Sequence, residues 1–276
     1  MRVIYKYKVL NLQKGGLVVG NVTFDQKGYI AVLTLNRPEV MNAFDYALLS
    51  ELHEQVEKIR TYSDIRVVII TGSGEKAFSV GADLKERKSL TEEEVRRNVY
   101  KIGEVFNAID TLPQPTIASI NGFAFGGGME LALACDFRIA RAGSIMGLTE
   151  TSLAIIPGAG GTQRLPRLIG EAKALELILT AKRVTAEEAL LIGLVNNVSK
   201  QDDLVETSMK LAQRMLSNGP IALKQAKFAI KQGMNTDLQT GLKIEQKAYE
   251  LLIPTEDRVE ALSAFAEKRK PNFKGK

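Results

Sequence analysis

The sequence predicts an α/β protein in which short strands alternate with helices. Two observations lead to this fold class. Through the first two thirds of the chain, short apolar runs of β type recur between segments with helical periodicity. After about residue 198, helical segments follow one another without a convincing strand. The chain has 276 residues, of which 45% are hydrophobic and 25% charged, as expected of a globular protein with a large core.

The first predicted elements are two strands and two helices. Apolar runs predict strands over residues 30–35 and 67–71. Thr91 and Glu94 have the spacing of a capping box, so a helix should begin there and continue to about Ile109. The other helix lies between the two strands and is predicted from an apolar stripe formed by Leu48, Leu49, Leu52, Val56 and Ile59.

Prolines and glycines divide the central third of the chain. Pro113 and Pro115 interrupt the backbone before a strand predicted over residues 116–120. Another strand is predicted over residues 137–140. The loop at residues 157–161 is rich in glycine, and a tight turn before the next helix is its simplest interpretation.

The C-terminal part is predicted to be entirely helical. Its helices are separated by glycines and prolines and cover residues 204–216, 221–232, 238–253 and 256–268. We therefore expect a domain boundary near residues 199–202. It divides a catalytic core over residues 1–200, of which 1–17 form a loose extension, from a helical module over residues 201–276. Apolar stripes on these helices require a partner, either the main domain or another subunit.

The composition excludes several kinds of chemistry. The chain has one histidine, His53, and one cysteine, Cys135, so a single chain cannot form a His/Cys zinc site or an intramolecular disulfide. His53 lies beside the apolar stripe of a predicted helix, which is typical of an ordinary surface histidine and disfavours a histidine-dependent hydrolase. The unpaired cysteine agrees with a reducing compartment, so we expect a cytoplasmic location.

Neither a membrane anchor nor a common nucleotide-binding loop is expected. No apolar run reaches the length of about 18 residues that a membrane span needs. Residues 1–8 lack the apolar core and the cleavage site of a secretion signal. No P-loop motif is present, and no G-x-G-x-x-G opens a helix after a strand. The net charge of +5 is small. The basic tail at residues 268–276 is either a solvated terminus or a segment that attracts a phosphorylated ligand.

Three segments combine glycines with groups that can stabilise charge. The glycines at 126–128 allow close approach of the backbone to a ligand, and Glu130 lies in the first turns of the next helix. Gly81-Ala82 forms a turn directly after a β-type run, and the N–H of Ala82 could point outward from it. Glu150 precedes the second glycine-rich loop. Taken singly, each also has an ordinary explanation as a helix start, a simple turn or an exposed glutamate.

Together and in this order, the segments resemble the enoyl-CoA hydratase/isomerase family, also called the crotonase superfamily. The resemblance covers about residues 20–276 and is carried by LNRPEVMNA, AFSVGADLKE, NGFAFGGGMELALACD, PGAGGTQRLPRLIG and SAFAEKRKPNFKGK. The C-terminal sequence looks like the branch that contains methylglutaconyl-CoA hydratases able to bind AU-rich RNA. The resemblance implies a spiral of repeated ββα units whose helical C-terminal module forms trimers, giving a homotrimer or a homohexamer.

The resemblance also implies how the site would work on an acyl-CoA thioester. The backbone N–H groups of Ala82 and Gly127 would form an oxyanion hole for the thioester carbonyl. Glu130 and Glu150 would be the catalytic pair, with Glu130 activating or orienting water and Glu150 donating a proton to the α-carbon.

For the CoA part, the resemblance points to the backbone of Ala82, Asp83, Leu84 and Lys85. A lysine of the tail, Lys270 or Lys274, would contact a phosphate of CoA. The resemblance implies that this lysine would come from a neighbouring subunit. No metal is implied, and no cofactor beyond the CoA that the substrate carries.

The implied activity is that of an enoyl-CoA hydratase of acyl-CoA degradation, such as fatty acid β-oxidation. Two alternatives stay open: a methylglutaconyl-CoA hydratase of branched-chain amino acid degradation, and a non-enzymatic RNA-binding protein with this fold. The RNA-binding relatives carry a lysine-rich first helix, whereas residues 45–60 here hold four acids against Lys58 and Arg60. Such a helix should repel phosphate, so nucleic acid is not an expected partner.

Overall fold

The larger of two sheets forms the centre of the molecule. The computed structural model describes residues 20–200 and 202–276, so the loose extension predicted over residues 1–17 lies outside the described residues. The sheet has the order β1-β2-β3-β5-β7-β10, with β1 antiparallel to β2 and the other pairs parallel. Its strands are Val22–Lys27 (β1), Ile30–Leu35 (β2), Val67–Gly72 (β3), Thr116–Ile120 (β5), Phe137–Arg141 (β7) and Asn197–Ser199 (β10).

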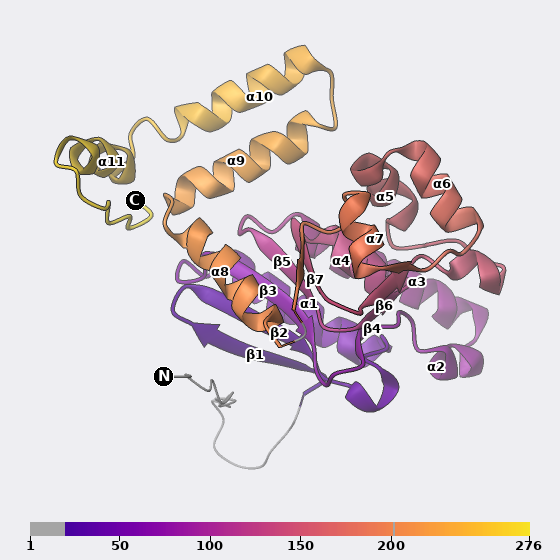
Figure 1. Ribbon diagram of the computed structural model, residues 1–276. Coiled ribbons are helices and arrows are strands. Elements are labelled where there is room, and N and C mark those ends of the chain that lie inside the picture. The colour runs from indigo at the N-terminus through magenta and orange to yellow at the C-terminus, as the bar shows by residue number, and fades with distance from the viewer. Residues whose placement is uncertain (1–19, 201) are drawn as a thin grey trace.

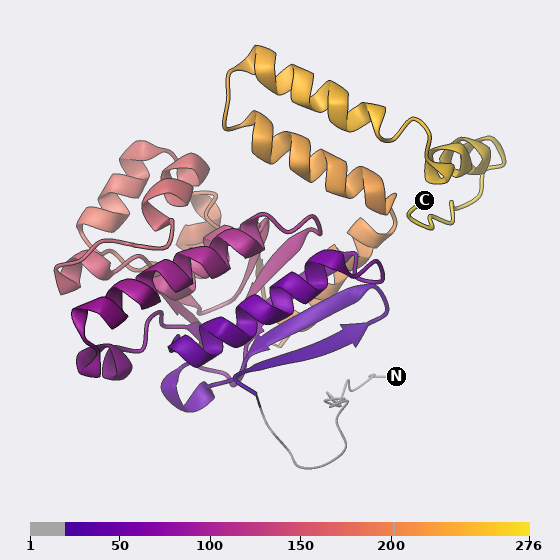
Figure 2. The same cartoon turned by 180° about the vertical axis from the view of Figure 1, so that it is seen from behind.

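Both faces of the larger sheet are buried at its central strands, since nearly every residue of β3 and β5 is buried, whereas the edge strand β1 is mostly only partly buried. Figure 2 shows α1 (Tyr46–Thr61) and α3 (Glu92–Asp110) across one face, where Leu33 and Ile70 belong to the main core. Figure 1 shows α8 (Leu204–Leu216) across the other face, where Ile69 and Ile117 meet the apolar side of α8. The sheet is therefore the middle layer of three.

The smaller sheet brings together three segments that are far apart in the sequence. Its order is β4-β6-β8-β9, and β4, β6 and β8 are parallel. Its strands are Ala77–Ser79 (β4), Phe123–Phe125 (β6), Ile145–Gly147 (β8) and Val184–Thr185 (β9). Because the carboxyl ends of parallel neighbours lie at one edge, the residues that follow β4, β6 and β8 meet there. Ala82, Gly127 and Glu150 are such residues.

The remaining elements surround this edge or leave the body of the molecule. The short ones are the 3-10 helices Pro38–Val40 (η1) and Glu150–Leu153 (η2) and the helices Leu84–Ser89 (α2), Gly127–Ala134 (α4), Gly161–Ile169 (α5), Glu171–Leu179 (α6) and Ala186–Leu191 (α7). The last three are Pro220–Gly233 (α9), Leu238–Glu250 (α10) and Glu256–Ala266 (α11). Figure 1 shows α9 and α10 side by side in an arm that extends away from the sheet, with α11 near the end where α9 begins and α10 ends.

The α/β prediction is confirmed, and so are the longer predicted elements. The capping box at Thr91 and Glu94 is present, and the C-terminal part is helical. The last two helices end at residues 250 and 266, a little before their predicted ends. The strands β6, β8 and β9 of the smaller sheet were not predicted, because strands of two or three residues are too short to show a period. Helices α6 and α7 were not predicted either.

The C-terminal helices differ in where they pack. Helix α8 lies on the sheet, with Leu204, Ala212 and Met215 buried against its strands, whereas α9 to α11 form the arm. The domain boundary near residues 199–202 stays a prediction. Across residues 20–200 and 202–276, none of the helices combines the length and the apolar character that crossing a membrane requires.

Candidate active site

A glycine turn after β4 presents a free backbone donor. Gly81 has φ +87°, a conformation that L side chains rarely adopt. On either side of Ala82, the O of Gly81 accepts from the N–H of Phe44 at 2.8 Å, and the N–H of Asp83 donates to the O of Phe44 at 2.9 Å. Within the described chain, the N–H of Ala82 itself donates to no protein acceptor. This turn therefore offers one unpaired donor.

The start of α4 supplies a second donor beside the first. Gly127 is the first residue of the helix, and its N–H likewise has no protein acceptor among the described residues. A Cβ added to Gly81 would lie 2.8 Å from the N of Gly127, and one added to Gly128 would lie 2.0 Å from the O of Ser79. Only glycines allow the two segments to approach this closely. The positive end of the helix dipole also favours negative charge in front of Gly127.

Buried polar side chains hold the Ala82 turn in place. Asn42 is fully buried, and its Nδ2 donates to the O of Ala77 at 2.9 Å. The hydroxyl of Ser79 donates to the O of Asn42 at 2.8 Å and accepts from the N–H of Gly81 at 3.2 Å. Arg37 pairs with Asp83 at 3.2 Å and so fixes the residue after Ala82. The donor is thus preorganised rather than mobile.

Glu130 is buried in the first turn of α4 and anchored by a loop. Its exposed fraction is only 3%, and its Oε1 accepts from the N–H groups of Ala159 and Gly161, each at 2.8 Å. Burial raises the pKa of the Glu130 carboxyl, while the two backbone donors and the charge of Arg164 oppose the increase. The glycine-rich loop at 157–161 is therefore more than a turn, since it orients this carboxylate.

Glu150 begins η2, three residues after the end of β8. Its residue exposure is 8%, and its Oε2 is buried with no protein partner within the described chain. A Cβ on Gly126 would lie 3.3 Å from its Oε1, so the carboxyl group lies against the glycines before α4. Burial raises the pKa of Glu150 to about 7, and the negative charge of Glu130 adds to the increase. The two carboxyl groups can thus share one proton near neutral pH.

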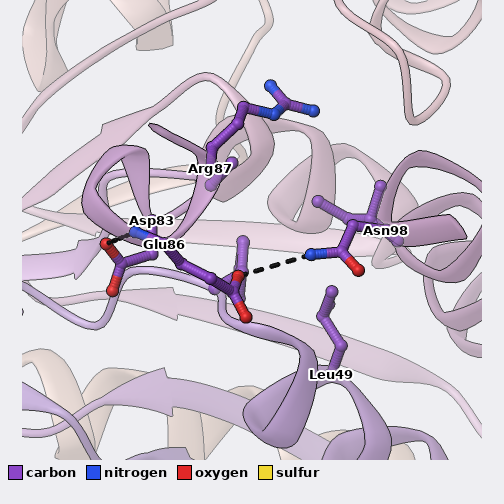
Figure 3. A pocket seen from close by; sticks show the side chains of 8 residues that line it. Leu49, Asp83, Glu86, Arg87 and Asn98 are labelled. Atoms are coloured by element: carbon purple, nitrogen blue, oxygen red, sulfur yellow. Dashed lines mark hydrogen bonds between the residues drawn. The ribbon is translucent and has the colours of Figure 1, made fainter. Parts of the chain in front are cut away.

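A small pocket lies beside Ala82 between α2 and α3 (Figure 3). Phe44, Leu49 and Ile102 form its apolar part. On its polar side, Nδ2 of Asn98 donates to Oε2 of Glu86 at 3.4 Å across the pocket, as Figure 3 shows. The pocket provides apolar surface next to the two backbone donors, where a ligand carbonyl with an attached carbon chain could lie.

The residues expected to meet CoA do not all gather at this site. The Asp83 carboxylate is engaged as the N-cap of α2 and with Arg37, whereas Leu84 and Lys85 are exposed beside Ala82. Lys274 follows α11, and Figures 1 and 2 show that segment at the opposite end of the molecule from α2. Within one chain, Lys274 therefore does not reach the site.

The side chains that the structure describes show no metal-binding arrangement, meaning a group of three or more His, Cys, Asp or Glu. What the site does offer is two unpaired N–H groups beside two buried carboxyl groups. Such a site can stabilise an oxyanion on a ligand carbonyl and move protons between water and carbon. The amides of Ala159 and Gly161 were missed by sequence reasoning, because their acceptor, Glu130, lies about 30 residues away in the sequence and only the folded chain brings it to the loop.

Comparison with known proteins gives matches over nearly the whole chain. The enoyl-CoA hydratase/isomerase family profile matches residues 25–276. A Bacillus subtilis protein, YngF, provisionally named an enoyl-CoA hydratase/isomerase, is 57% identical over 90% of this chain and 95% of its own. Human mitochondrial methylglutaconyl-CoA hydratase is 47% identical over 89% of this chain and 74% of its own. The crystal structure of an enoyl-CoA hydratase from Bacillus anthracis superposes with a TM-score of 0.92 at 51% identity, covering 93% and 100% of the two chains.

Proposed function

The chain belongs to the enoyl-CoA hydratase/isomerase family, and we propose that it adds water across the 2,3 double bond of an enoyl-CoA thioester to give a 3-hydroxyacyl-CoA. One observation carries the proposal. Two buried carboxyl groups, those of Glu130 and Glu150, lie at the same sheet edge as the unpaired N–H groups of Ala82 and Gly127. A family member with both carboxylates has the groups that hydration needs.

The two backbone donors would act on the thioester oxygen. As the oxygen of water attacks the β-carbon, electrons move from the double bond toward the thioester carbonyl. An enolate forms, and its negative charge lies mainly on the carbonyl oxygen. The N–H groups of Ala82 and Gly127 stabilise that charge in a dry site, and each donor of this kind raises the rate by about 10²- to 10³-fold.

The two carboxyl groups would complete the addition. Glu130, held by its two amide donors, orients the water and takes up its proton. Glu150, protonated up to a pH of about 7, delivers a proton to the α-carbon. One hydroxyl and one proton are added in total. The proton gained by Glu130 replaces the one lost by Glu150 within the pair, so the site needs no cofactor beyond the CoA of the substrate.

Hydration of crotonyl-CoA tests the proposal, because the conjugated thioester absorbance disappears as water adds. We expect Glu130→Gln and Glu150→Gln each to lower kcat by at least about 10²-fold. Glu187→Gln, at an exposed position on α7, is the matched control and should keep full activity. Circular dichroism establishes that the variants are folded. Full activity in either active-site variant contradicts the assignment.

A second candidate is a methylglutaconyl-CoA hydratase, which the 47% identity to the human enzyme of that name supports. That substrate carries a branch and a carboxylate on its acyl group. The ratio of kcat/KM for 3-methylglutaconyl-CoA to that for crotonyl-CoA separates the two candidates. A ratio above about 10 assigns the branched substrate, and a ratio below about 0.1 assigns the straight chain.

RNA binding is disfavoured by the surface of α1. Its basic residues Lys58 and Arg60 are paired with Glu54 and Glu57 on the same helix, which leaves no concentrated positive charge for phosphate. A filter-binding assay with AU-rich RNA between low and high salt should show no salt-sensitive retention.

For the assembly we propose a homotrimer or homohexamer built through the arm. Large apolar side chains exposed along α9 to α11 support this, since Phe228, Met234 and Phe265 are each more than half exposed in one chain. Light scattering gives the mass directly. We further propose a cytoplasmic enzyme of acyl-CoA degradation, for which cell fractionation and growth of a deletion strain on fatty acids are the tests.

A further inference from the structure

Arg164 clamps the loop that holds Glu130. It lies in α5, which begins where that loop ends, and its Nη1 donates to the O of Ala159 at 2.9 Å. A Cβ on Gly160, whose φ is +103°, would lie 2.1 Å from the same Nη1. The guanidinium thus lies directly over the backbone of Gly160. The residues on either side of that glycine, Ala159 and Gly161, are the two that donate to Glu130.

The other side of the guanidinium is fixed by α3. Nε and Nη2 of Arg164 both donate to Oδ2 of Asp110 at 3.2 Å, and Nη2 also donates to Oδ1 of Asn107 at 2.7 Å. The side chain of Arg164 is only 16% exposed. A planar guanidinium held by charge-assisted bonds on two sides is a rigid bridge between the loop and the helix.

Asp110 also connects this bridge to the C-terminal arm. Its Oδ1 pairs with Nζ of Lys231 on α9, which donates in addition to the O of Asp110 at 3.1 Å. Lys231 contacts Asp136 at 3.0 Å as well. A continuous chain of polar contacts therefore runs from Lys231 through Asp110 and Arg164 to the loop that holds Glu130.

We infer that Arg164 is a positioning residue for Glu130, and that Asp110 and Lys231 anchor it to the arm. The inference rests on the proposed function of Glu130. Its physical basis is that Glu130 is oriented by two backbone donors, whose positions depend on the O of Ala159 and on the turn at Gly160. A displacement near 1 Å of a catalytic group can cost about 10²-fold in rate.

Kinetics of enoyl-CoA hydration tests the inference with three variants of one helix. Arg164→Gln should lower kcat by about 10- to 100-fold and change KM by less than about twofold. Arg164→Lys should recover only part of kcat, because one ammonium cannot bridge Ala159 and Asp110 as the guanidinium does. Arg167→Gln is the control, since Arg167 lies one turn later and, among the described residues, bonds only to Gln163. It should equal the wild type.

Two further measurements separate positioning from general destabilisation. Amide hydrogen exchange at Ala159 and Gly161 should be faster in Arg164→Gln than in Arg167→Gln, while exchange in β3 stays unchanged. Added to Glu130→Gln, the Arg164 change should have almost no further effect on kcat, because the group it positions is gone. An equal loss in both backgrounds, or wild-type kcat in Arg164→Gln, overturns the inference.

Asp110 and the arm are tested in the same way. Asp110→Asn should lower kcat, as Arg164→Gln does. The double variant of Asp110→Asn and Arg164→Gln should be no slower than Arg164→Gln alone. Lys231→Gln, with its mass checked by light scattering, should lower kcat by about 2- to 5-fold without dissociation. Wild-type kcat in Lys231→Gln refutes the link to the arm. If instead Glu130→Gln keeps full activity, the proposed function fails, which is distinguishable from failure of the positioning role.

Discussion

The carboxyl group of Glu150 lies where burial and the negative charge of Glu130 together raise its pKa to about 7. The two residues are 20 positions apart and belong to different elements, α4 and η2. Their environments differ. Glu130 has two amide donors on Oε1, whereas Oε2 of Glu150 has no partner within the described chain. The amide donors favour the charged form of Glu130, so the shared proton belongs mainly to Glu150.

The rate of hydration should therefore depend on pH around neutrality. Glu150 must be protonated to donate, so kcat/KM should fall as the pH rises through about 7. The decrease should approach tenfold per pH unit on the alkaline side. Initial rates with crotonyl-CoA between pH 5 and 9 measure the profile. A rate that stays constant to pH 9 contradicts the assignment of Glu150 as the proton donor.

Stability should respond to pH through the same residue. The pKa of Glu150 is raised from 4.5 to about 7 in the folded state, so between these values the folded chain holds a proton that the unfolded chain releases. The contribution of Glu150 to stability thus falls as pH rises through this window. Glu150→Gln lacks this titration. The Tm of Glu150→Gln minus the Tm of the wild type should be about 2–4 °C larger at pH 8 than at pH 5. This corresponds to a loss of about 1 kcal/mol in the unfolding free energy of the wild type, after allowance for solvent contact.

Calorimetry at the two pH values, with Glu187→Gln as the control, measures this difference. The control should show the same offset at both values, because Glu187 is exposed. A Tm difference for Glu150→Gln that is independent of pH means that the pKa of Glu150 is not raised.

The approach of the two backbone donors should depend on Gly81. In Gly81→Ala, the added Cβ would lie 2.8 Å from the N of Gly127, and the alanine would have to adopt a φ of +87°. We expect kcat to fall by about 10²-fold, because the oxyanion donors are pushed apart. Gly193→Ala is the control, since Gly193 has φ +75° but no atom within 4 Å of its added Cβ. Its stability should fall by about 1 kcal/mol, while its kcat should not change.

The attachment of the arm should depend on Lys227. Its Nζ lies 2.6 Å from Oδ2 of Asp136 and donates to the O of Gln114 at 2.9 Å, in a contact that is partly buried. Lys227→Met should weaken docking of α9 by about 1–3 kcal/mol, because Asp136 loses its shortest ion pair and keeps Lys231. Faster amide exchange in α9 is the measurement. Lys224, on the same helix, forms no ion pair with the residues that the structure describes, so Lys224→Met should leave exchange unchanged.

Much of the fold could be predicted because its longer elements have strong local signals. The stripe from Leu48 to Ile59 and the capping box at Thr91 each indicate a helix from a few neighbouring residues. The short strands β6 and β8 could not be found in this way, since each forms by pairing with strands far away in the sequence. The site depends on these strands, because their carboxyl ends bring its segments to one edge.

The sequence by itself determined the family and the side chains of the candidate site, Glu130 and Glu150, because separate motifs occur in one order along the chain. Only the tertiary structure decided how those side chains are held. The amides of Ala159 and Gly161 reach Glu130 across about 30 residues, and Arg164 is joined to Asp110 across 54. Such contacts follow from the meeting of elements in space. Backbone donors also have the same chemistry in nearly every residue, so nothing within the loop at 157–161 indicates that two of its amides meet Glu130.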